Sequence, residues 1–392
     1  MSYRKLKADY LFDGFQFRDS GTVLVCREDG TIETILDESL AGEGVEKWDG
    51  IITPGFINCH CHLELSHLKG RIPEKMGLVD FVFSVVGHRQ LSAEFIREAI
   101  RSGEEEMQSS GIVAVGDICN TSDTQSAKSS GRLLYYNFIE LFGWSPGQAS
   151  TRFEGGKLLF DLFYKKTGGN KHLSITPHAP YSVSKELWDL LRPGFQDKTI
   201  SIHNQESAAE NEFFLTGGGD LNRMYSLMKM DISHFKVPGT HSPPDYLPKM
   251  KSASKILLVH NTYMDEPDLE EAMHFNKNLF FCFCPHANLY IEDRLPDIPV
   301  FLKNKCRIVL GTDSLASNHQ LSILEEMKII KRTFPDIPTA IMLQWATSNG
   351  ADALDFEEST GDFSKGKKPG VVIIENILYG EIQSSSTSRR IL

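Results

Sequence analysis

Apolar runs short enough to be buried strands alternate with helix-like stretches through most of the chain, from Ile51 to Phe334. Most of the eight runs are followed by a helical pattern or by a long excursion. The runs are IITPGFINCH, IVAVGDIC, RLLYYNFIEL, HLSITPHA, TISIHNQE, KILLVHN, NLFFCFC and CRIVLGTD. This alternation predicts an α/β fold of parallel β/α units, closed into a (β/α)8 TIM barrel. A doubly wound open sheet is the alternative, but no glycine-rich phosphate motif follows the first run.

The N-terminal segment shows a different pattern, of short strands joined by tight turns. The runs GTVLVC and TIETIL flank Glu28-Asp29-Gly30, which is typical of a β-hairpin. Two short strands are predicted after Lys365 and are expected to return to the N-terminal segment. The polar run SSSTSRR near the end is expected to be disordered. We therefore expect a small β-sandwich-like domain and a barrel domain, with the boundaries 1–52 and 365–384 for the former and 53–364 for the latter.

Helix signals support this division. Ser92 is a favourable N-cap, Glu94 lies in the first predicted turn, and Gly111 follows the end of the helical pattern. Residues 215–254 are rich in Gly, Pro and polar side chains and connect two predicted core strands. A connection of this length is unusual inside a compact domain, so we expect a functional lid or an inserted helix pair there.

Composition narrows the class of protein. The 392 residues are 41% hydrophobic and 24% charged, as in an ordinary globular protein. A net charge of −11 argues against nucleic acid or an anionic membrane as a partner. No apolar run is long enough for a membrane span and the N-terminus has no apolar signal core, so we expect a cytoplasmic protein. Seven cysteines without a C-x-x-C motif favour reduced thiols over disulfides or a cysteine zinc site.

Polar, ligand-capable side chains stand at the carboxyl ends of several predicted strands. His60 and His62 end the first strand two residues apart, so both imidazoles point to the same face. This pair alone is a weak signal, because a solvated turn explains it equally well. The fourth, fifth, sixth and eighth strands end in His178, His203, His260 and Asp313. Barrel active sites are built at this end of the strands, which predicts one shared site.

The motifs PGFINCHCH, TPHAPYSVS, HNQESAAE, VHN and GTDSLASN follow one another in an order that resembles the amidohydrolase superfamily. The resemblance is to its branch of aminohydrolases and chlorohydrolases acting on ring systems, and it covers essentially the whole chain. It implies one divalent metal ion and a homodimer. It also implies that Glu206 and His260 flank the attacked carbon and that His178 contacts the substrate. The implied metal ligands are His60, His62, His203 and Asp313.

The chemistry of these side chains agrees with that implication. Three neutral imidazoles and one carboxylate suit Zn²⁺, with Fe²⁺ as the second choice. The cation lowers the pKa of a water molecule, and Asp313 can take the released proton. Glu206 can protonate a ring nitrogen, while His260 can hydrogen-bond the developing charge. We therefore expect a hydrolase acting on a C–N bond, which converts a ring C–NH2 to C=O with release of ammonia.

Two departures from the family pattern matter. Dinuclear members carry a bridging Lys at the end of the fourth strand, where this chain has Thr176-Pro177-His178 and only Lys171 before the strand. A mononuclear site is therefore expected. The seventh strand is followed by the run Cys-Pro-His286-Ala287-Asn288, where related deaminases more often have Cys-Pro-x-Ser-Asn. This strand end usually faces substrate, so the specificity is expected to be shifted.

The substrate is expected to be a small heterocyclic amine, purine-like or nucleoside-like. Glu64 could bind a ribose hydroxyl or a ring N–H, or simply be an acid at the start of a helix. Aromatic side chains could stack on the ring or belong to the core: Phe81, Phe83, Trp144 and Tyr181. Aminodeoxyfutalosine is the first candidate, because deaminases with a His-x-His-x-Glu opening resemble this chain. Guanine-like, pterin and S-adenosylhomocysteine-type substrates stay open, as do a chlorohydrolase, a cyclic amide hydrolase and a catalytically silent ligand-binding homologue.

Overall fold

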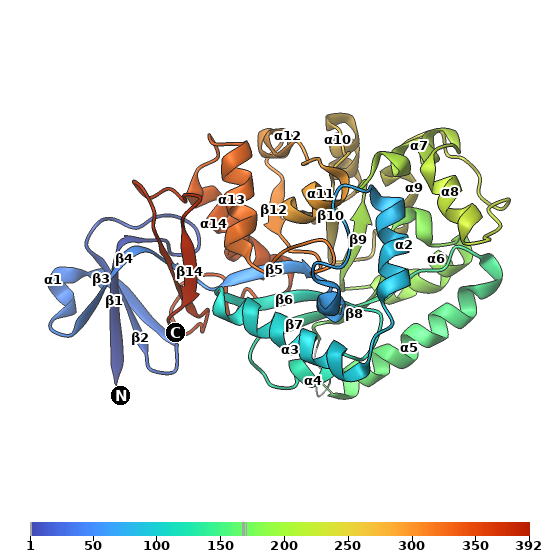
Figure 1. Cartoon of the computed structure of the whole chain (residues 1–392). Coiled ribbons are helices and arrows are strands. Elements are labelled where there is room, and N and C mark those ends of the chain that lie inside the picture. The colour runs from blue at the N-terminus through green and yellow to red at the C-terminus, as the bar shows by residue number, and fades with distance from the viewer. Residues whose placement is uncertain (1, 167–168, 170) are drawn as a thin grey trace.

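A six-stranded sheet forms the small β domain at one end of the molecule, and both chain termini lie beside it (Figure 1). The computed structural model describes residues 2–166, 169 and 171–392. The order of the strands in this sheet is β14-β13-β4-β1-β2-β3. Their bounds are β1 Tyr3–Leu11, β2 Thr22–Arg27, β3 Ile32–Asp37, β4 Val45–Pro54, β13 Val371–Glu375 and β14 Thr387–Arg390.

The two ends of the chain build this sheet together. β2 and β3 form the predicted hairpin, and β13 pairs antiparallel with β4, with Ile373 opposite Ile52. The predicted return of the C-terminal segment is confirmed. The prediction of disorder for SSSTSRR is wrong, because β14 pairs with the free edge of β13 and Arg389 forms an ion pair with Glu375 at 3.2 Å. An edge strand satisfies its backbone through one neighbour and leaves polar side chains in solvent, so polar composition does not prevent it.

Two four-stranded parallel sheets carry the rest of the fold, in the orders β5-β6-β7-β8 and β9-β10-β11-β12. Seven of the eight predicted apolar runs contain one of these strands, and the first run covers all of β5 but its last residue. Their bounds are β5 Phe56–Cys61, β6 Ile112–Cys119, β7 Leu134–Leu141, β8 Leu173–Pro177, β9 Thr199–Asn204, β10 Lys255–His260, β11 Leu279–Phe283 and β12 Arg307–Leu310. Nearly all of these strand residues are buried, as expected for parallel sheets covered by helices.

Hydrogen bonds also join the borders of the two sheets. The backbone N–H of His203 donates to the carbonyl of His178 at 2.9 Å, which links the ends of β9 and β8. The backbone N–H of Thr312 donates to the carbonyl of His60 at 3.0 Å, and Asp313 forms a parallel bridge with Cys61. The carboxyl ends of β5, β8, β9 and β12 therefore lie close together.

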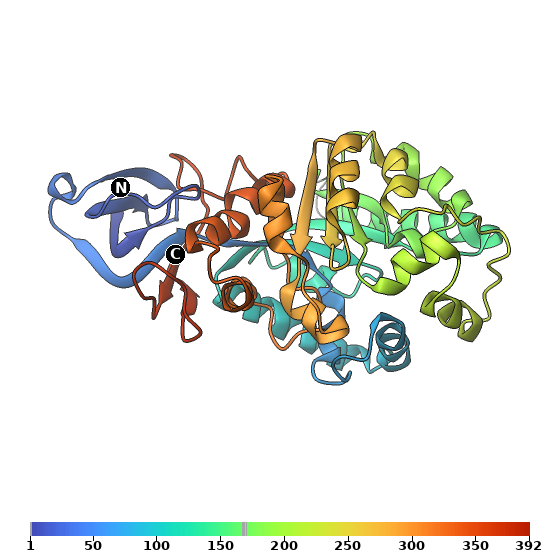
Figure 2. The same ribbon diagram turned by 90° about the horizontal axis from the view of Figure 1, so that it is seen from above.

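Helices surround the two parallel sheets, as the view from above shows (Figure 2). The long helix predicted after Ser92 is α3, and the Ser92 hydroxyl accepts a hydrogen bond from the backbone of Phe95. None of the described helices combines the length and the apolar character needed to cross a bilayer. Helix bounds are α1 Glu38–Ala41, α2 Leu78–His88, α3 Ala93–Ser109, α4 Gln125–Lys128, α5 Ala149–Lys166, α6 Lys185–Leu191, α7 Ala208–Thr216, α8 Asp220–Leu227, α9 Pro243–Tyr246, α10 Glu266–Phe275, α11 Pro285–Glu292, α12 Ile298–Lys303, α13 Ile323–Thr333, α14 Thr339–Ala346 and α15 Ser348–Ala353.

Two long connections pack against each other beside the sheets: the one after β5, which contains α2, and the one after β9, which contains α8. The segment 215–254 contains α8 and the short α9, as an inserted helix pair would. Arg223 on α8 forms an ion pair with Asp80 on α2 at 2.8 Å. Phe81 of α2 and Tyr225 of α8 belong to one apolar cluster. The two connections are therefore held together mainly by apolar packing, because an exposed ion pair contributes little.

Candidate active site

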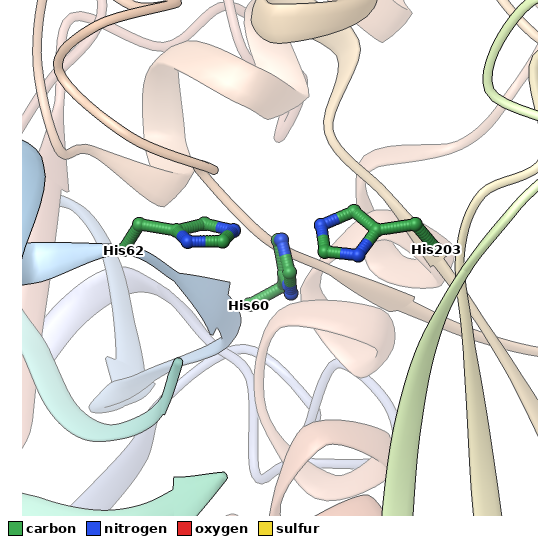
Figure 3. Close-up of side chains that lie close together, drawn as sticks. All are labelled: His60, His62 and His203. Carbon is green, nitrogen blue, oxygen red and sulfur yellow. The ribbon is translucent and has the colours of Figure 1, made fainter. Parts of the chain in front are cut away.

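Three histidine rings converge on one point at the carboxyl ends of β5 and β9 (Figure 3). His60 and His62 leave β5 on the same face, as the two-residue spacing predicts, and His203 comes from β9. One ring nitrogen from each residue lies within 4.8 Å of the others. All three side chains are buried. The arrangement brings together histidines that are 143 positions apart in the sequence.

Asp313 completes the cluster from the end of β12. Its Oδ1 lies 3.6 Å from His60 Nε2 and 3.5 Å from His62 Nε2. The hydroxyl of Ser317 donates a short hydrogen bond to the other oxygen, Oδ2. Burial alone would raise the pKa of Asp313, but the neighbouring imidazoles of His60 and His62 lower this pKa well below its ordinary value. The carboxyl group is therefore ionised and turned toward the imidazoles.

The cluster fits a divalent cation. Both ring nitrogens of His60 are buried and have no hydrogen-bond partner among the described residues, and a bound cation would occupy one of them. Burial lowers the pKa of His62 well below its ordinary value and that of His203 to about 3. Both imidazoles are therefore neutral near pH 7, as metal binding requires. His60, His62, His203 and Asp313 are candidate ligands for such an ion, and His260 is a further candidate, because a ring nitrogen of His260 lies within 4.8 Å of ligand atoms of His60 and Asp313.

Glu206 and His260 lie beside this cluster. Glu206 follows β9, and its Oε1 is 3.6 Å from Nε2 of His260 at the end of β10. Burial and the nearby charge of Asp313 raise the pKa of Glu206 well above its ordinary value, which favours the protonated form of its carboxyl group. The side chain of Asn288 lies 3.1 Å from His260 Nδ1 and holds that ring in place. A proton donor therefore stands next to the metal-binding cluster.

A cavity of about 320 Å³ lies over these groups. His62, His203, Glu206, His260 and Asp313 all contribute to its wall. Its remaining wall is largely apolar, as in many sites for small organic ligands. His178 lines it with its Nδ1 2.8 Å from the hydroxyl of Ser182. Of the aromatic residues suggested by the sequence, Phe83 is absent from the wall and three are part of it: Phe81, Trp144 and Tyr181.

Glu64 is placed differently from the other predicted residues. It is buried, and it is not part of the cavity wall. One of its oxygens forms a short ion pair with Arg89, and the other accepts the backbone N–H groups of Asn120 and Thr121 at 3.0 and 2.9 Å. Arg89 does line the cavity. Protein groups therefore occupy both oxygens of Glu64.

Sequence reasoning missed several residues of the site. Glu140 is the last but one residue of β7 and lines the cavity, and the signal was available, because an acid at the end of a buried strand stands where barrel sites form. No local signal marked Met224 and Tyr225 of α8, which form part of the wall from the inserted segment. Their contribution depends on how that segment folds over the strands.

Several known proteins are similar to this chain in sequence or in fold. The curated aminodeoxyfutalosine deaminase of Deinococcus radiodurans is 25% identical over 317 residues, which cover 78% of this chain and 73% of that protein. The adenosine deaminase of Helicobacter pylori is 28% identical over 315 residues, covering 78% and 75%. The crystal structure of Helicobacter pylori aminofutalosine deaminase with methylthio-coformycin has a TM-score of 0.80 at 21% identity, covering 97% of this chain and 93% of that one. That similarity shows a shared fold.

The family resemblance drawn from the motifs is confirmed by a sequence model. The pattern of the amidohydrolase family matches residues 51–391, which leaves outside it little more than the first strands of the small β domain. The match includes every residue of the histidine–aspartate cluster described above. The chain therefore belongs to the amidohydrolase family.

Proposed function

We propose that this protein is a metal-dependent hydrolytic deaminase, which converts a ring C–NH2 of a nucleoside-like substrate to C=O and releases ammonia. One observation carries the proposal: a buried acid with a raised pKa, Glu206, lies 3.6 Å from His260 beside a histidine–aspartate cluster that fits a divalent cation. A site that only bound ligands would not need a proton donor beside a metal cluster.

The roles follow from the positions of the side chains. When bound, the cation supplies Lewis acidity, which lowers the pKa of a water molecule toward neutrality. Asp313, held by Ser317, accepts the proton of the attacking water. Glu206 donates a proton to the ring nitrogen next to the amine-bearing carbon, which makes that carbon more electrophilic. The Nε2 of His260 faces Glu206 and stabilises the developing charge. The proton accepted by Asp313 then passes to the amine, which leaves as ammonia, and the hydroxyl proton of the adduct returns to Glu206 as the C=O bond forms.

The substrate class rests on the cavity and on the relatives. A largely apolar wall with Phe81, Trp144 and Tyr181 suits an aromatic ring system. We propose aminodeoxyfutalosine as the first substrate to test, supported by the similarity to deaminases of that name in Deinococcus radiodurans and Nitratiruptor. Adenosine and 5′-deoxyadenosine are the next candidates, since relatives carry these names. His178 is proposed to contact the substrate, and Glu64 to act at the site by holding Arg89.

Zinc is the proposed metal, at one ion per chain. Three imidazoles and a carboxylate suit it. The Nδ1–H of His203 already donates to the His178 carbonyl, so only one nitrogen of His203 is free for a metal. A second ion held by Glu140, His178 and His203 would compete for that same nitrogen. This supports a mononuclear site.

We propose that the eight parallel strands close into one barrel and that a separate small β domain lies beside it. The hydrogen bonds between β12 and β5 and between β8 and β9 support closure of the eight strands into one barrel. The pairing of β13 with β4 supports a small β domain built from both ends of the chain beside a barrel domain, with the expected bounds 1–52, 53–364 and 365–384 extended because β4 runs to Pro54 and β14 to Arg390. Seven free cysteines support a reducing compartment such as the cytoplasm. We also propose a homodimer, which light scattering would test.

Ammonia release from zinc-loaded protein tests the function directly. The panel holds aminodeoxyfutalosine, adenosine, 5′-deoxyadenosine, guanine and S-adenosylhomocysteine, with a chlorotriazine and a cyclic amide as non-amine probes. We expect ammonia from at least one nucleoside and none from the Glu206→Gln variant. Turnover of the cyclic amide or the chlorotriazine alone would replace deamination by the corresponding hydrolysis. Binding of nucleosides without turnover would favour a ligand-binding homologue.

A further inference from the structure

Glu140 is a buried carboxylate on the cavity wall that the mechanism does not use. It is the last but one residue of β7 and is 5% exposed. Its Oε2 accepts a hydrogen bond from the side-chain amide of Asn120 at 3.1 Å. Its Oε1 is buried and has no hydrogen-bond partner among the described residues. Buried carboxylate oxygens are rarely left in this state, because desolvation is costly. Because Glu140 also lines the cavity, a donor on a bound molecule could reach this free oxygen.

The neighbouring side chains do not supply that donor. His203 Nδ1 lies 3.5 Å from Glu140 Oε1, but its hydrogen is already donated to the His178 carbonyl at 2.8 Å. No Lys or Arg of the described chain forms an ion pair with Glu140, whereas Glu64 has Arg89 as its partner. Glu140 is thus an acceptor on the wall without a cation beside it.

A second metal ion does not account for the free oxygen either. The ligand atoms of Glu140, His178 and His203 lie within 4.8 Å of one another. However, the free nitrogen of His203 belongs to the first cluster, and Nδ1 of His178 is hydrogen-bonded to Ser182 at 2.8 Å. Glu140 and one nitrogen of His178 remain, which is fewer than the three protein ligands of a typical catalytic site. A hydrogen-bond donor on a substrate in the cavity would match this oxygen.

We propose that Glu140 is a specificity-determining residue, whose free carboxylate oxygen accepts a hydrogen bond from a donor on the substrate, either a sugar hydroxyl or a ring N–H. The inference rests on the proposed function and deepens it. Glu140 stands next to the metal ligand His203 and the cavity residue His178, so the donor lies close to the reacting ring. Glu140 then has the role that the sequence suggested for Glu64.

Glu140→Gln tests this, because it keeps the shape and removes the charge. We measure kcat/KM for adenosine, 2′-deoxyadenosine, 3′-deoxyadenosine and guanine. If a hydroxyl is the donor, the wild type loses about 10–100-fold on one deoxy analogue, as for a hydrogen bond to a charged group. Glu140→Gln should lose the same factor on adenosine and hardly any on that analogue. If a ring N–H is the donor, the loss appears on guanine and the adenosine series is unaffected.

The controls separate recognition from structure. Glu104→Gln changes another buried carboxylate, which is bound to the hydroxyl of Tyr135 and lies outside the cavity, and it should preserve the substrate ratios. Zinc content and chelator competition should match the wild type in Glu140→Gln, since His203 keeps its bond to the His178 carbonyl. Glu140→Asp, which withdraws the carboxylate by one methylene, is the second variant and should lose at least about tenfold on the same substrate.

Two outcomes overturn different claims. If the wild type deaminates nucleosides and both Glu140 variants slow all substrates by the same factor, Glu140 only positions His203 and the inference is wrong. If zinc-loaded wild type releases ammonia from no member of the panel, the proposed function fails first.

Discussion

The ring of His203 donates its Nδ1 hydrogen to the backbone carbonyl of His178 at 2.8 Å. A carbonyl can only accept, so this bond fixes the tautomer and leaves Nε2 unprotonated for a metal ion. The donor lies on β9 and the acceptor directly follows β8, so the contact between the ends of these two strands orients the ligand. The orientation of His203 is therefore built into the protein before any metal binds.

Because the imidazoles of His62 and His203 are neutral, Asp313 is ionised and His203 is oriented by the protein, metal binding should be tight and should stabilise the fold. We expect about one zinc ion per chain by elemental analysis, and loss of activity in a strong chelator with recovery on adding Zn²⁺. A ligand that binds only the folded chain raises the melting temperature, so the zinc-loaded protein should melt higher than the stripped one. Two tightly held ions per chain would contradict the mononuclear site.

Asp313→Asn should abolish turnover while preserving the fold. The amide keeps the size of the side chain and its contact with Ser317, but it cannot accept the proton of water. We expect a drop in kcat of about 10²–10⁴-fold, the usual contribution of a positioned base. Ammonia release measures the rate, and thermal unfolding with zinc analysis shows whether the variant is folded and loaded. Ser317→Ala, which frees the Oδ2 of Asp313, should cause a smaller loss. Turnover near the wild-type rate in Asp313→Asn would remove this residue from the mechanism.

Much of this site was predictable because it depends on strand order. His60, His203, His260 and Asp313 each end a buried apolar run, and parallel strands bring such ends to one face. The position of each ligand therefore follows from the apolar run that precedes it and from the rule that the carboxyl ends of parallel strands meet at one face. The same rule would have found Glu140, which is the last but one residue of the third run.

The features that the sequence did not predict depend on contacts between segments that lie outside the eight parallel strands. Glu64 follows the His-x-His pair and was expected to face the substrate, but Arg89, 25 positions later, lies against its carboxylate. Tyr225 reaches the cavity only because α8 packs on α2 through apolar contacts that no periodicity reveals. The prediction of disorder near the C-terminus was wrong for a similar reason. The residues of β14 do not reveal that β13 offers a free edge for them to pair with.

Glu64→Gln should raise KM about tenfold and leave kcat little changed. The amide cannot neutralise Arg89, and the loop at Asn120 and Thr121 loses its charged anchor. Steady-state kinetics on the best substrate measures the effect. Arg89→Gln should behave similarly, and the double variant should be no worse than either single variant, because the two residues act as one unit. If the two losses simply multiply, Glu64 and Arg89 act separately and Glu64 contacts the substrate on its own.

The pH dependence of stability should be traceable to Glu326. This carboxyl group is fully buried and accepts hydrogen bonds from the Asn318 side chain and the His286 backbone, both at 2.8 Å. Burial raises its pKa to about 8. Between the ordinary pKa of a glutamate and about 8, the folded chain holds a proton that the unfolded chain has released. The free energy of unfolding therefore falls as the pH rises through this window.

Glu326→Gln removes the titrating group, and with it this contribution to the pH dependence of the free energy of unfolding. We expect the variant to lose less stability than the wild type between about pH 5 and pH 8, and to be more stable at the upper end by about 1–3 kcal/mol. Thermal unfolding of the zinc-loaded proteins across this range measures both slopes. Glu325→Gln, at the neighbouring position of α13 with a partly exposed carboxylate, is the matched control and should keep the wild-type slope. Parallel slopes for wild type and Glu326→Gln would show that Glu326 is ionised in the folded protein, against the direction that its burial dictates.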